Sequence, residues 1–206
     1  TLTLTDAHIV VAEVSAFQLT TCDTFRPVVA VMTNIAEDHL DYHGGFAPYQ
    51  AAKRRVWAAM DTGDVVVLNR DDPSIAAWEL PTSPTIRWFS LADPDADATY
   101  RDRVLIVRGR PLMTRDELPL LGVHNVANAL AAALACEAMG VPDDVIKAGL
   151  MGYRPLPHRL ETIATIDGVR WVNDSKATNP NAASAGIRAI DTPLVLLTGG
   201  SSKDAD

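Results

Sequence analysis

The stretch Val65-Val66-Val67-Leu68 is an uninterrupted run of apolar residues, three of them β-branched. Such a run is typical of a strand buried on both faces, because a strand with one face in water alternates apolar and polar residues. Similar strand-like runs occur at Ile9–Val14, Val28–Thr33, Thr85–Phe89, Val104–Val107, Glu161–Ile166, Val169–Val172 and Leu194–Leu197. Helical patterns lie between them at Tyr49–Met60, Val126–Met139, Asp143–Gly149 and Ala182–Ala189. This alternation predicts an α/β fold with a mostly parallel sheet flanked by helices.

One region departs from the alternation of strands and helices. Val104–Val107, the turn Arg108-Gly109-Arg110 and the run Pro111-Leu112-Met113 predict a hairpin at the edge of the sheet. The acidic segment Asp93–Asp102, which comes before the hairpin, is expected to be an exposed loop.

A domain boundary is expected near the two prolines Pro155 and Pro157. Each proline removes a backbone donor and stops a helix. A new order of strand, turn, strand, loop and helix begins after them. We therefore expect two α/β domains, residues 1–156 and residues 157–206.

Length and composition narrow the classes of protein. A chain of 206 residues is long enough for a core, and its net charge of −8 argues against a non-specific grip on nucleic acid or an anionic membrane. No segment has the roughly 18 apolar residues that a membrane helix needs, and there is no signal peptide pattern. Cys22 and Cys136 have neither a metal-ligand nor a disulfide spacing. We expect a cytoplasmic protein with reduced thiols, and a fragment, because both ends look cut.

The loop from Trp171 to Pro180 is rich in polar groups at the carboxyl end of an apolar run. Open α/β sheets place their ligands at that end of their strands. Asp174 could hold a ribose or a base, Lys176 a phosphate or a carboxylate, and Thr178 a further oxygen. We therefore interpret this segment as a binding loop, the alternative being a solvated turn.

Acidic residues and a histidine follow two of the expected strands. Glu13 closes the first and is followed by Ser15; it could ligate Mg²⁺ or simply favour the start of a helix. Glu37, Asp38, His39 and Asp41 share the segment after the second. This cluster suits a metal or a polyphosphate–metal complex, with His39 as ligand or substrate contact, and the alternative is a solvated acidic turn.

Three further segments carry groups that have both a structural and a functional interpretation. Lys53 opens a helix and by itself reads as a solvated lysine beside the basic face of Arg54 and Arg55; it could ligate a cation only as a carbamate. Asn125 is either the N-cap of the most apolar helix or a contact to a nucleobase. Arg159 suits an oxyanion, or is a surface arginine.

The segment Gly199-Gly200-Ser201-Ser202-Lys203 allows close approach to a carboxylate or a phosphate, but it is weak evidence alone. It is not a phosphate-binding loop, because the pattern Gly-x-x-x-x-Gly-Lys-Ser/Thr is absent from the sequence.

Taken in order, these segments resemble the Mur ligase family across nearly the whole chain. The matching stretches are Glu13 through Leu19, Asn34 through Asp41, Ala51-Ala52-Lys53, Asn69 through Asp72, Gly122 through Leu130, Leu156 through Glu161, Asn173 through Pro180, and Gly199-Gly200 with Lys203. In the loop Asn173 through Pro180, the form Asp-Ser-Lys-Ala-Thr-Asn-Pro is similar to that of the members that add D-glutamate. Relatives that add other residues usually carry a histidine before the Asn-Pro or Thr-Pro of that loop.

The resemblance implies a P-loop-NTPase-like central domain followed by the start of a Rossmann-like domain. It also implies an ATP-dependent ligase of cytoplasmic peptidoglycan synthesis, a monomer, whose small-molecule substrates are UDP-N-acetylmuramoyl-L-alanine and D-glutamate. The intermediate would be an acyl phosphate. There are two alternatives. One is another carboxylate–amine ligase of the Mur or folylpolyglutamate type, and the other is a non-catalytic nucleotide-binding module.

The same resemblance implies roles for single residues. Glu13, His39 and Lys53 would serve two Mg²⁺ sites, with Lys53 carbamylated by CO2. Lys53, His39 and Lys176 would be catalytic. The adenine and ribose–phosphate end of ATP would be held by Asn125, Arg159 and Asp174, and the other substrates by Ser15, His39, Thr178 and Lys203.

Two departures from the family pattern matter. Ser15-Ala16-Phe17-Gln18-Leu19-Thr20 stands where Ser-Ser-Phe-Gln-Leu-Glu is usual, a change that we expect to be tolerated. The family's phosphate-binding loop precedes the segment that corresponds to Thr1, so we expect the fragment by itself to be inactive.

Overall fold

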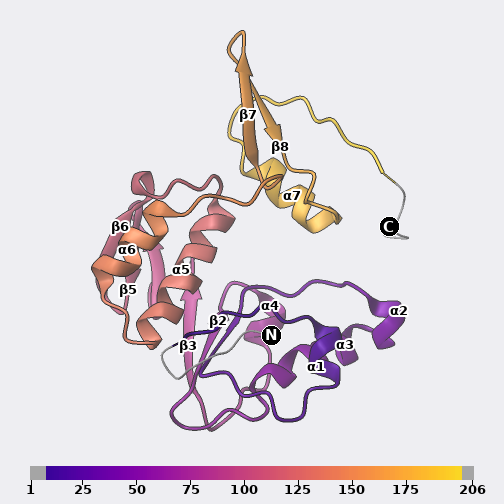
Figure 1. Cartoon of the computed structure of the whole chain (residues 1–206), viewed down its shortest axis with the longest axis vertical. Coiled ribbons are helices and arrows are strands. Elements are labelled where there is room, and N and C mark those ends of the chain that lie inside the picture. Colours follow the sequence, from indigo (N-terminus) through magenta and orange to yellow (C-terminus); the bar gives the residue numbers. More distant parts are fainter. Residues whose placement is uncertain (1–7, 201–206) are drawn as a thin grey trace.

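The computed structural model describes residues 8–200, and its centre is a six-stranded sheet of order β1-β2-β3-β4-β5-β6 (Figure 1). The strands are β1 (Val29–Met32), β2 (Val65–Asn69), β3 (Thr85–Ser90), β4 (Ala98–Arg101), β5 (Val104–Val107) and β6 (Arg110–Thr114). The first four are parallel to one another, whereas β5 and β6 are antiparallel additions at one edge. The predicted α/β class and the hairpin at the edge of the sheet are confirmed.

Helices cover both faces of this sheet. They are α1 (Ala16–Thr20), α2 (Leu40–His43), α3 (Phe46–Arg54), α4 (Pro73–Ala76), α5 (Val123–Ala138), α6 (Asp143–Gly152) and α7 (Pro180–Arg188), with short 3-10 turns η1 (Arg55–Trp57) and η2 (Arg115–Glu117). Helices α1, α3 and α4 pack on one face, and α5 and α6 pack on the other. Among residues 8–200, no helix combines the length and the apolar character needed to cross a membrane.

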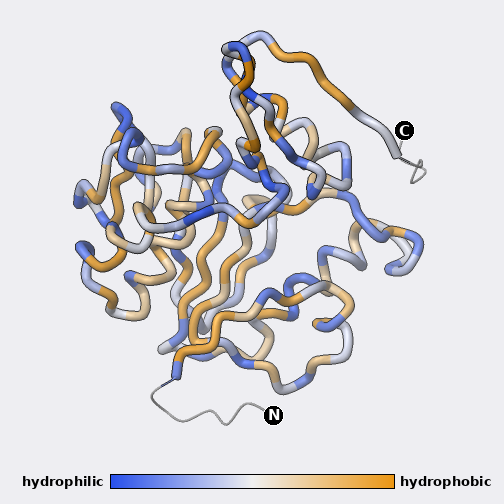
Figure 2. Tube along the Cα trace, turned by 45° about the horizontal axis from the view of Figure 1, so that its top comes forward, coloured by the Kyte–Doolittle hydropathy of each residue, from blue (hydrophilic) through white to orange (hydrophobic). Residues whose placement is uncertain are grey.

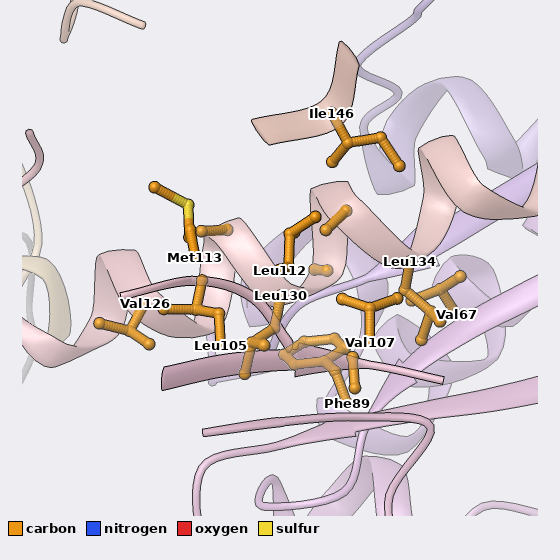
Figure 3. Packing of buried hydrophobic residues seen from close by; sticks show 14 of the residues in the cluster. Val67, Phe89, Leu105, Val107, Leu112, Met113, Val126, Leu130, Leu134 and Ile146 are labelled. Atoms are coloured by element: carbon orange, nitrogen blue, oxygen red, sulfur yellow. The ribbon is translucent and has the colours of Figure 1, made fainter. Parts of the chain in front are cut away.

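The apolar run of β2 explains why both faces are covered. Val65 and Val67 belong to the core that contains α5, whereas Val66 and Leu68 belong to the core that contains α1 and α3. Successive side chains of a strand point to opposite faces, so a continuous apolar run needs a helix layer on each side. Figure 3 shows Leu130 and Leu134 of α5 next to Val67 and Phe89 of the sheet.

The chain after α6 forms a second, smaller unit. Strands β7 (Glu161–Ile166) and β8 (Val169–Asn173) pair as an antiparallel hairpin that is a separate two-stranded sheet, and α7 follows them (Figure 1). Helix α6 ends at Gly152, before the two prolines. The predicted boundary at residues 156 and 157 falls in the segment that joins α6 to β7.

Two predicted strands are wrong. Ile9–Val14 and Leu194–Leu197 are not strands, and Val11 and Val195 are 94% and 90% exposed. Strand propensity depends on packing partners, and within residues 8–200 neither segment is paired into a sheet. Figure 2 shows the apolar stretch near the C-terminal end as extended chain apart from the main sheet.

The predicted loop Asp93–Asp102 is wrong in its second half. Ala98 begins β4 and pairs with Val107, and it is fully buried. The hairpin next to it supplies the hydrogen-bonding partner that an exposed loop would lack.

Candidate active site

Lys53 lies in the last turn of α3 and is half-buried. The prediction that it opens a helix is wrong, because the helix already begins at Phe46 after Gly45. Burial lowers the pKa of the Lys53 ammonium, while the carboxylates of Glu13 and Asp38 raise it in part. The structure therefore brings Glu13 and Asp38 into the electrostatic surroundings of Lys53, although the three residues come from separate segments.

Glu13 does not close a strand, which corrects that prediction; it lies in an irregular segment and is exposed. The chain then enters α1 through a capping box around Ser15. The Ser15 hydroxyl accepts the N–H of Gln18 at 3.2 Å, and the Gln18 side chain accepts the N–H of Ser15 at 2.8 Å. This reciprocal cap fixes the start of α1 and so the position of Phe17 in its first turn.

His39 follows β1 and is the residue before α2, with a left-handed backbone at φ 52° and ψ 34°. Its side chain is half exposed, and its Nε2 lies 3.7 Å from a carboxylate oxygen of Asp38. The ring packs edge-on against Phe17, with ring centroids 4.9 Å apart. His39 is thus held beside α1 while one edge stays open to solvent.

Two residues behind the His39 loop hold it in place, and the sequence interpretation missed both of these roles. Asp72 accepts the backbone N–H of Ile35 at 2.9 Å, and the side-chain amide of Asn69 donates to the carbonyl of Thr33 at 2.7 Å. Asp72 is also the N-cap of α4, with Pro73 next to it. Asp followed by Pro is a helix-start signal, with Asp as the N-cap and Pro as the first helical residue, so the cap could have been found in the sequence.

Arg55 was expected to belong to an ordinary basic face of the helix, and this prediction is wrong. Its guanidinium donates to the carbonyls of Leu19 and Cys22 at 2.8 and 2.9 Å and to the carboxylate of Asp23 at 2.8 Å. Arg55 therefore ties the end of α1 to the end of α3, a contact between distant segments that no local pattern reveals.

A second group of predicted residues gathers where α5 begins. Asn125 is inside the first turn of α5, whose N-cap is Gly122, so the prediction that Asn125 is the N-cap is wrong. Its amide nitrogen donates to the carbonyl of Leu121 at 2.7 Å, and its oxygen accepts from the side chain of Asn128 at 3.2 Å. Asn125 thus closes the turn from inside the helix.

Asp174 follows β8 and lies in the loop that leads to α7. One carboxylate oxygen accepts the N–H of Leu160 at 3.0 Å, and the other lies so close to Gly186 that a Cβ on that residue would clash with it. Burial lowers the pKa of His124 in α5, and the charge of Asp174 raises it in part. Asp174 therefore acts electrostatically on His124 of α5 and also packs against Gly186 of α7.

Three of the remaining predicted residues lie in the loops before β7 and after β8. Arg159 is exposed between His158 and Leu160, both of which have positive φ. Lys176 and Thr178 are exposed after β8, and the Lys176 N–H donates to the carbonyl of His158 at 3.1 Å. Lys203 lies outside the described residues. Between positions 8 and 200, no hydrogen bond, ion pair or ring contact joins the group around Lys53 to the group around Asp174.

The chemistry of the donor set bears on whether Mg²⁺ fits the first group. In the described part of the chain, no three His, Cys, Asp or Glu side chains are grouped so as to hold a metal ion. Glu13 and Asp38 supply carboxylates near Lys53, but an ammonium has no lone pair to offer a cation. The lowered pKa favours the neutral amine, which is the form that reacts with CO2. A carbamate at Lys53 would add the missing oxygens, and with it the set suits Mg²⁺.

In comparisons with known proteins, the sequence matches one family. The model of the Mur ligase middle domain matches residues 1–136. Over 203 residues the chain is 42% identical to UDP-N-acetylmuramoylalanine--D-glutamate ligase of Pelotomaculum thermopropionicum, covering 96% of this chain and 45% of that protein. The enzyme of the same name from Salinibacter ruber is 43% identical over 208 residues, with the same two coverages. The chain thus spans a little under half the length of these relatives.

Solved structures agree with the fold. MurF from Acinetobacter baumannii is similar with a TM-score of 0.66 and 25% identity, over 77% of this chain and 36% of that chain. The UDP-N-acetylmuramate–alanine ligase MurC from Thermotoga maritima has a TM-score of 0.63 at 19% identity, over 85% of this chain and 40% of that chain, which shows a shared fold.

Proposed function

Because this chain belongs to the Mur ligase family, we propose that it forms part of an ATP-dependent ligase that joins D-glutamate to UDP-N-acetylmuramoyl-L-alanine. The observation that carries the proposal is the identity of 42–43% to two D-glutamate ligases along 96% of the chain. The loop Asp174-Ser175-Lys176-Ala177-Thr178 supports it, because its charged and hydroxyl groups directly follow strand β8.

The reaction makes an amide from a carboxylate and an amine. A terminal carboxylate oxygen of UDP-N-acetylmuramoyl-L-alanine attacks the γ-phosphorus of ATP, the bond from that phosphorus to the β,γ-bridging oxygen breaks, and ADP leaves while the substrate becomes an acyl phosphate. The neutral amine of D-glutamate attacks the acyl carbon, the C–N bond forms, the nitrogen loses a proton, and phosphate leaves with the electron pair of the C–O bond. Negative charge builds up on phosphoryl and acyl oxygens, so cationic groups must lie where that charge develops.

Lys53 serves this chemistry as a carbamate. The half-buried amine has a lowered pKa, so it attacks CO2 in its neutral form and loses a proton to give a carboxylate-like group. Together with Glu13 and His39, the carbamate would hold Mg²⁺ at two sites, and these ions would neutralise charge on the transferring phosphoryl group. Ser15 and His39 contact the acceptor substrate.

The second group binds the nucleotide and the amino acid. Asn125 presents its amide to the adenine, and Asp174 presents its carboxylate to the ribose. Arg159 adds an exposed guanidinium for a phosphate. Lys176, Thr178 and Lys203 contact D-glutamate and the reacting phosphate, with Lys176 and His39 in catalytic roles. A solved relative by fold, MurF from Thermotoga maritima, is in complex with ADP, which supports a nucleotide site in this fold.

The cellular setting follows from the reaction. We assign the ligase to the cytoplasmic stage of peptidoglycan synthesis and expect it to act as a monomer. Residues 1–156 belong to its central ATP-binding domain, and residues 157–206 to the start of the domain that binds the amino acid.

Phosphate release by a full-length ligase that contains this chain tests the proposal. Release should require UDP-N-acetylmuramoyl-L-alanine and D-glutamate together, and L-lysine, meso-diaminopimelate or L-glutamate should not replace D-glutamate. Release with one of those amino acids and not with D-glutamate would sink the assignment in favour of another carboxylate–amine ligase. The 206-residue chain alone should release no phosphate, because it contains no Gly-x-x-x-x-Gly-Lys-Ser/Thr loop.

A further inference from the structure

Five ring side chains pack together beside the candidate metal residues, and we call them the Phe17 cluster: Phe17, His39, Tyr42, His43 and Tyr49. Phe17 is at its centre, with ring centroids 4.9 Å from His39, 4.5 Å from Tyr42 and 5.3 Å from His43. These rings come from α1, from the residue before α2, and from α2 itself. One side chain of α1 therefore contacts three rings of the segment that follows β1.

The cluster continues to Lys53. The rings of His43 and Tyr49 are 5.3 Å apart, and Tyr49 is buried in α3. The Nζ of Lys53, one turn further along the same helix, is 5.7 Å from the centroid of the Tyr49 ring. A continuous set of contacts thus runs from His39 through Phe17, His43 and Tyr49 to Lys53.

His43 owes its position to ring packing. Its Nε2 is buried and has no hydrogen-bond partner within residues 8–200. A buried nitrogen without a partner is unfavourable, so the contacts with Phe17, Tyr42 and Tyr49 must outweigh that cost. No hydrogen bond within that range fixes the orientation of the imidazole; the neighbouring rings do.

His39 needs the same support. A residue with a Cβ rarely adopts a left-handed backbone, and His39 does so immediately before α2. Such a conformation persists where the surrounding structure holds it. Within residues 8–200, the edge-on contact with Phe17 joins the His39 ring to another element of the fold, helix α1.

We propose that Phe17 and His43 are positioning residues that hold His39 and Lys53 in a fixed relation across α1, α2 and α3. The inference rests on the proposed function, in which His39 and Lys53 act on the same reaction. It assigns a purpose to two rings that the proposed function gives no role in binding substrate or metal. Because a small displacement of a reacting group costs a large factor in rate, loss of the Phe17 ring should lower kcat although it removes no catalytic group.

Phe17→Leu tests this, with Phe17→Tyr as the conservative variant and Phe89→Leu as the matched control. Phe89 is a buried aromatic residue in the core on the opposite face of the sheet. In a full-length ligase, Phe17→Leu should lower kcat about 10- to 100-fold and leave the KM for ATP unchanged. Phe17→Tyr should keep most of the wild-type kcat. Phe89→Leu should lower the free energy of unfolding, with a smaller loss of kcat than Phe17→Leu.

A second readout needs no turnover. In NMR spectra of this 206-residue chain, the carbon-bound imidazole protons of His39 and His43 should carry ring-current shifts. Phe17→Leu should remove the contribution of Phe17 from both and change the shifts of both rings, while Tyr42 and Tyr49 still act on His43; Phe89→Leu should leave all these shifts in place. Unchanged shifts in Phe17→Leu, or equal effects of Phe17→Leu and Phe89→Leu on shifts or kcat, would overturn the inference. If the wild-type ligase does not use D-glutamate at all, the proposed function fails, and the shifts still decide whether Phe17 orients these rings.

Discussion

The carboxylate of Asp72 joins α4 to the loop that carries His39, because one of its oxygens accepts the backbone N–H of Ile35 at 2.9 Å. Its other oxygen accepts the N–H groups of Ser74 and Ile75 at 2.9 and 3.0 Å. Asp72 and Ile35 are both buried, so water cannot replace the bond between them. The position of a candidate catalytic loop thus depends on a carboxylate 37 residues further along the chain.

Replacing Asp72 should therefore cost stability. Asp72→Ala leaves three N–H groups without their acceptor and should lower the free energy of unfolding by about 2–3 kcal/mol. Asp72→Asn keeps one oxygen acceptor and should cost less. Urea denaturation of the chain measures both, with Glu79→Ala, an exposed residue, as the control that should stay within about 0.5 kcal/mol. Equal midpoints for Asp72→Ala and Glu79→Ala would contradict the role of Asp72.

The fold was largely predictable, because periodicity reports which faces of a strand are covered. The run Val65–Leu68 correctly required helices on both faces of the sheet, and the helices α5, α6 and α7 lie where their patterns predicted. The failures at Ile9–Val14 and Leu194–Leu197 have one cause: β-branched residues fit a strand only where another strand offers its backbone.

The site was less predictable, since its order comes from contacts between distant segments. Sequence motifs singled out Glu13, His39 and Lys53, and the structure places a Glu13 charge near Lys53. What holds these groups was not visible: Arg55 binds carbonyls more than thirty residues away, and Phe17 contacts a ring after β1. Local patterns contain no information about such partners.

Glu117 should make the stability depend on pH in the acid range. The ammonium of Lys147, 2.7 Å away, and the N–H and hydroxyl of Thr114 lower the pKa of Glu117 from its ordinary 4.5 to about 2. A depressed pKa in the folded state stabilises the fold above pH 4.5, and this contribution is lost as the pH falls from 4.5 towards 2. Glu117→Gln should thus be less stable than wild type at neutral pH and approach it near pH 2.

Urea denaturation at several pH values measures this difference. Glu79→Gln is the control, because Glu79 is exposed and forms no ion pair within residues 8–200. A difference between wild type and Glu117→Gln that stays constant from pH 7 down to pH 2 would show that Glu117 does not titrate in this way.

Gly122 should tolerate a side chain less well than Gly140, although both have positive φ, at 82° and 76°. A Cβ on Gly122 would lie 2.6 Å from the Cβ of Ala189 and 2.7 Å from the His124 ring, whereas a Cβ on Gly140 meets nothing within 4 Å. Gly140→Ala should cost about 1 kcal/mol from backbone strain alone. Gly122→Ala should cost a further 1–3 kcal/mol or so from overpacking. Equal losses in thermal or urea unfolding would mean that α7 does not press on the start of α5.

Lys53 should react with CO2 more readily than an exposed lysine. Burial lowers the pKa of its amine, so the neutral form is populated at a lower pH. In a full-length ligase equilibrated with ¹³C-labelled CO2, a carbamate signal should be present in wild type and missing in Lys53→Ala. Lys53→Ala should also lower kcat about 100-fold or more, because the metal loses its charged oxygen ligand.

The control for this loss is Lys147→Ala, which removes a different lysine and breaks only its ion pair with Glu117. It should keep both the carbamate signal and the activity. A short carboxylic acid added to Lys53→Ala should restore part of the activity, since its oxygens can occupy the space of the missing carbamate. Near-normal turnover of Lys53→Ala, or a carbamate signal that survives the substitution, would remove Lys53 from the magnesium site.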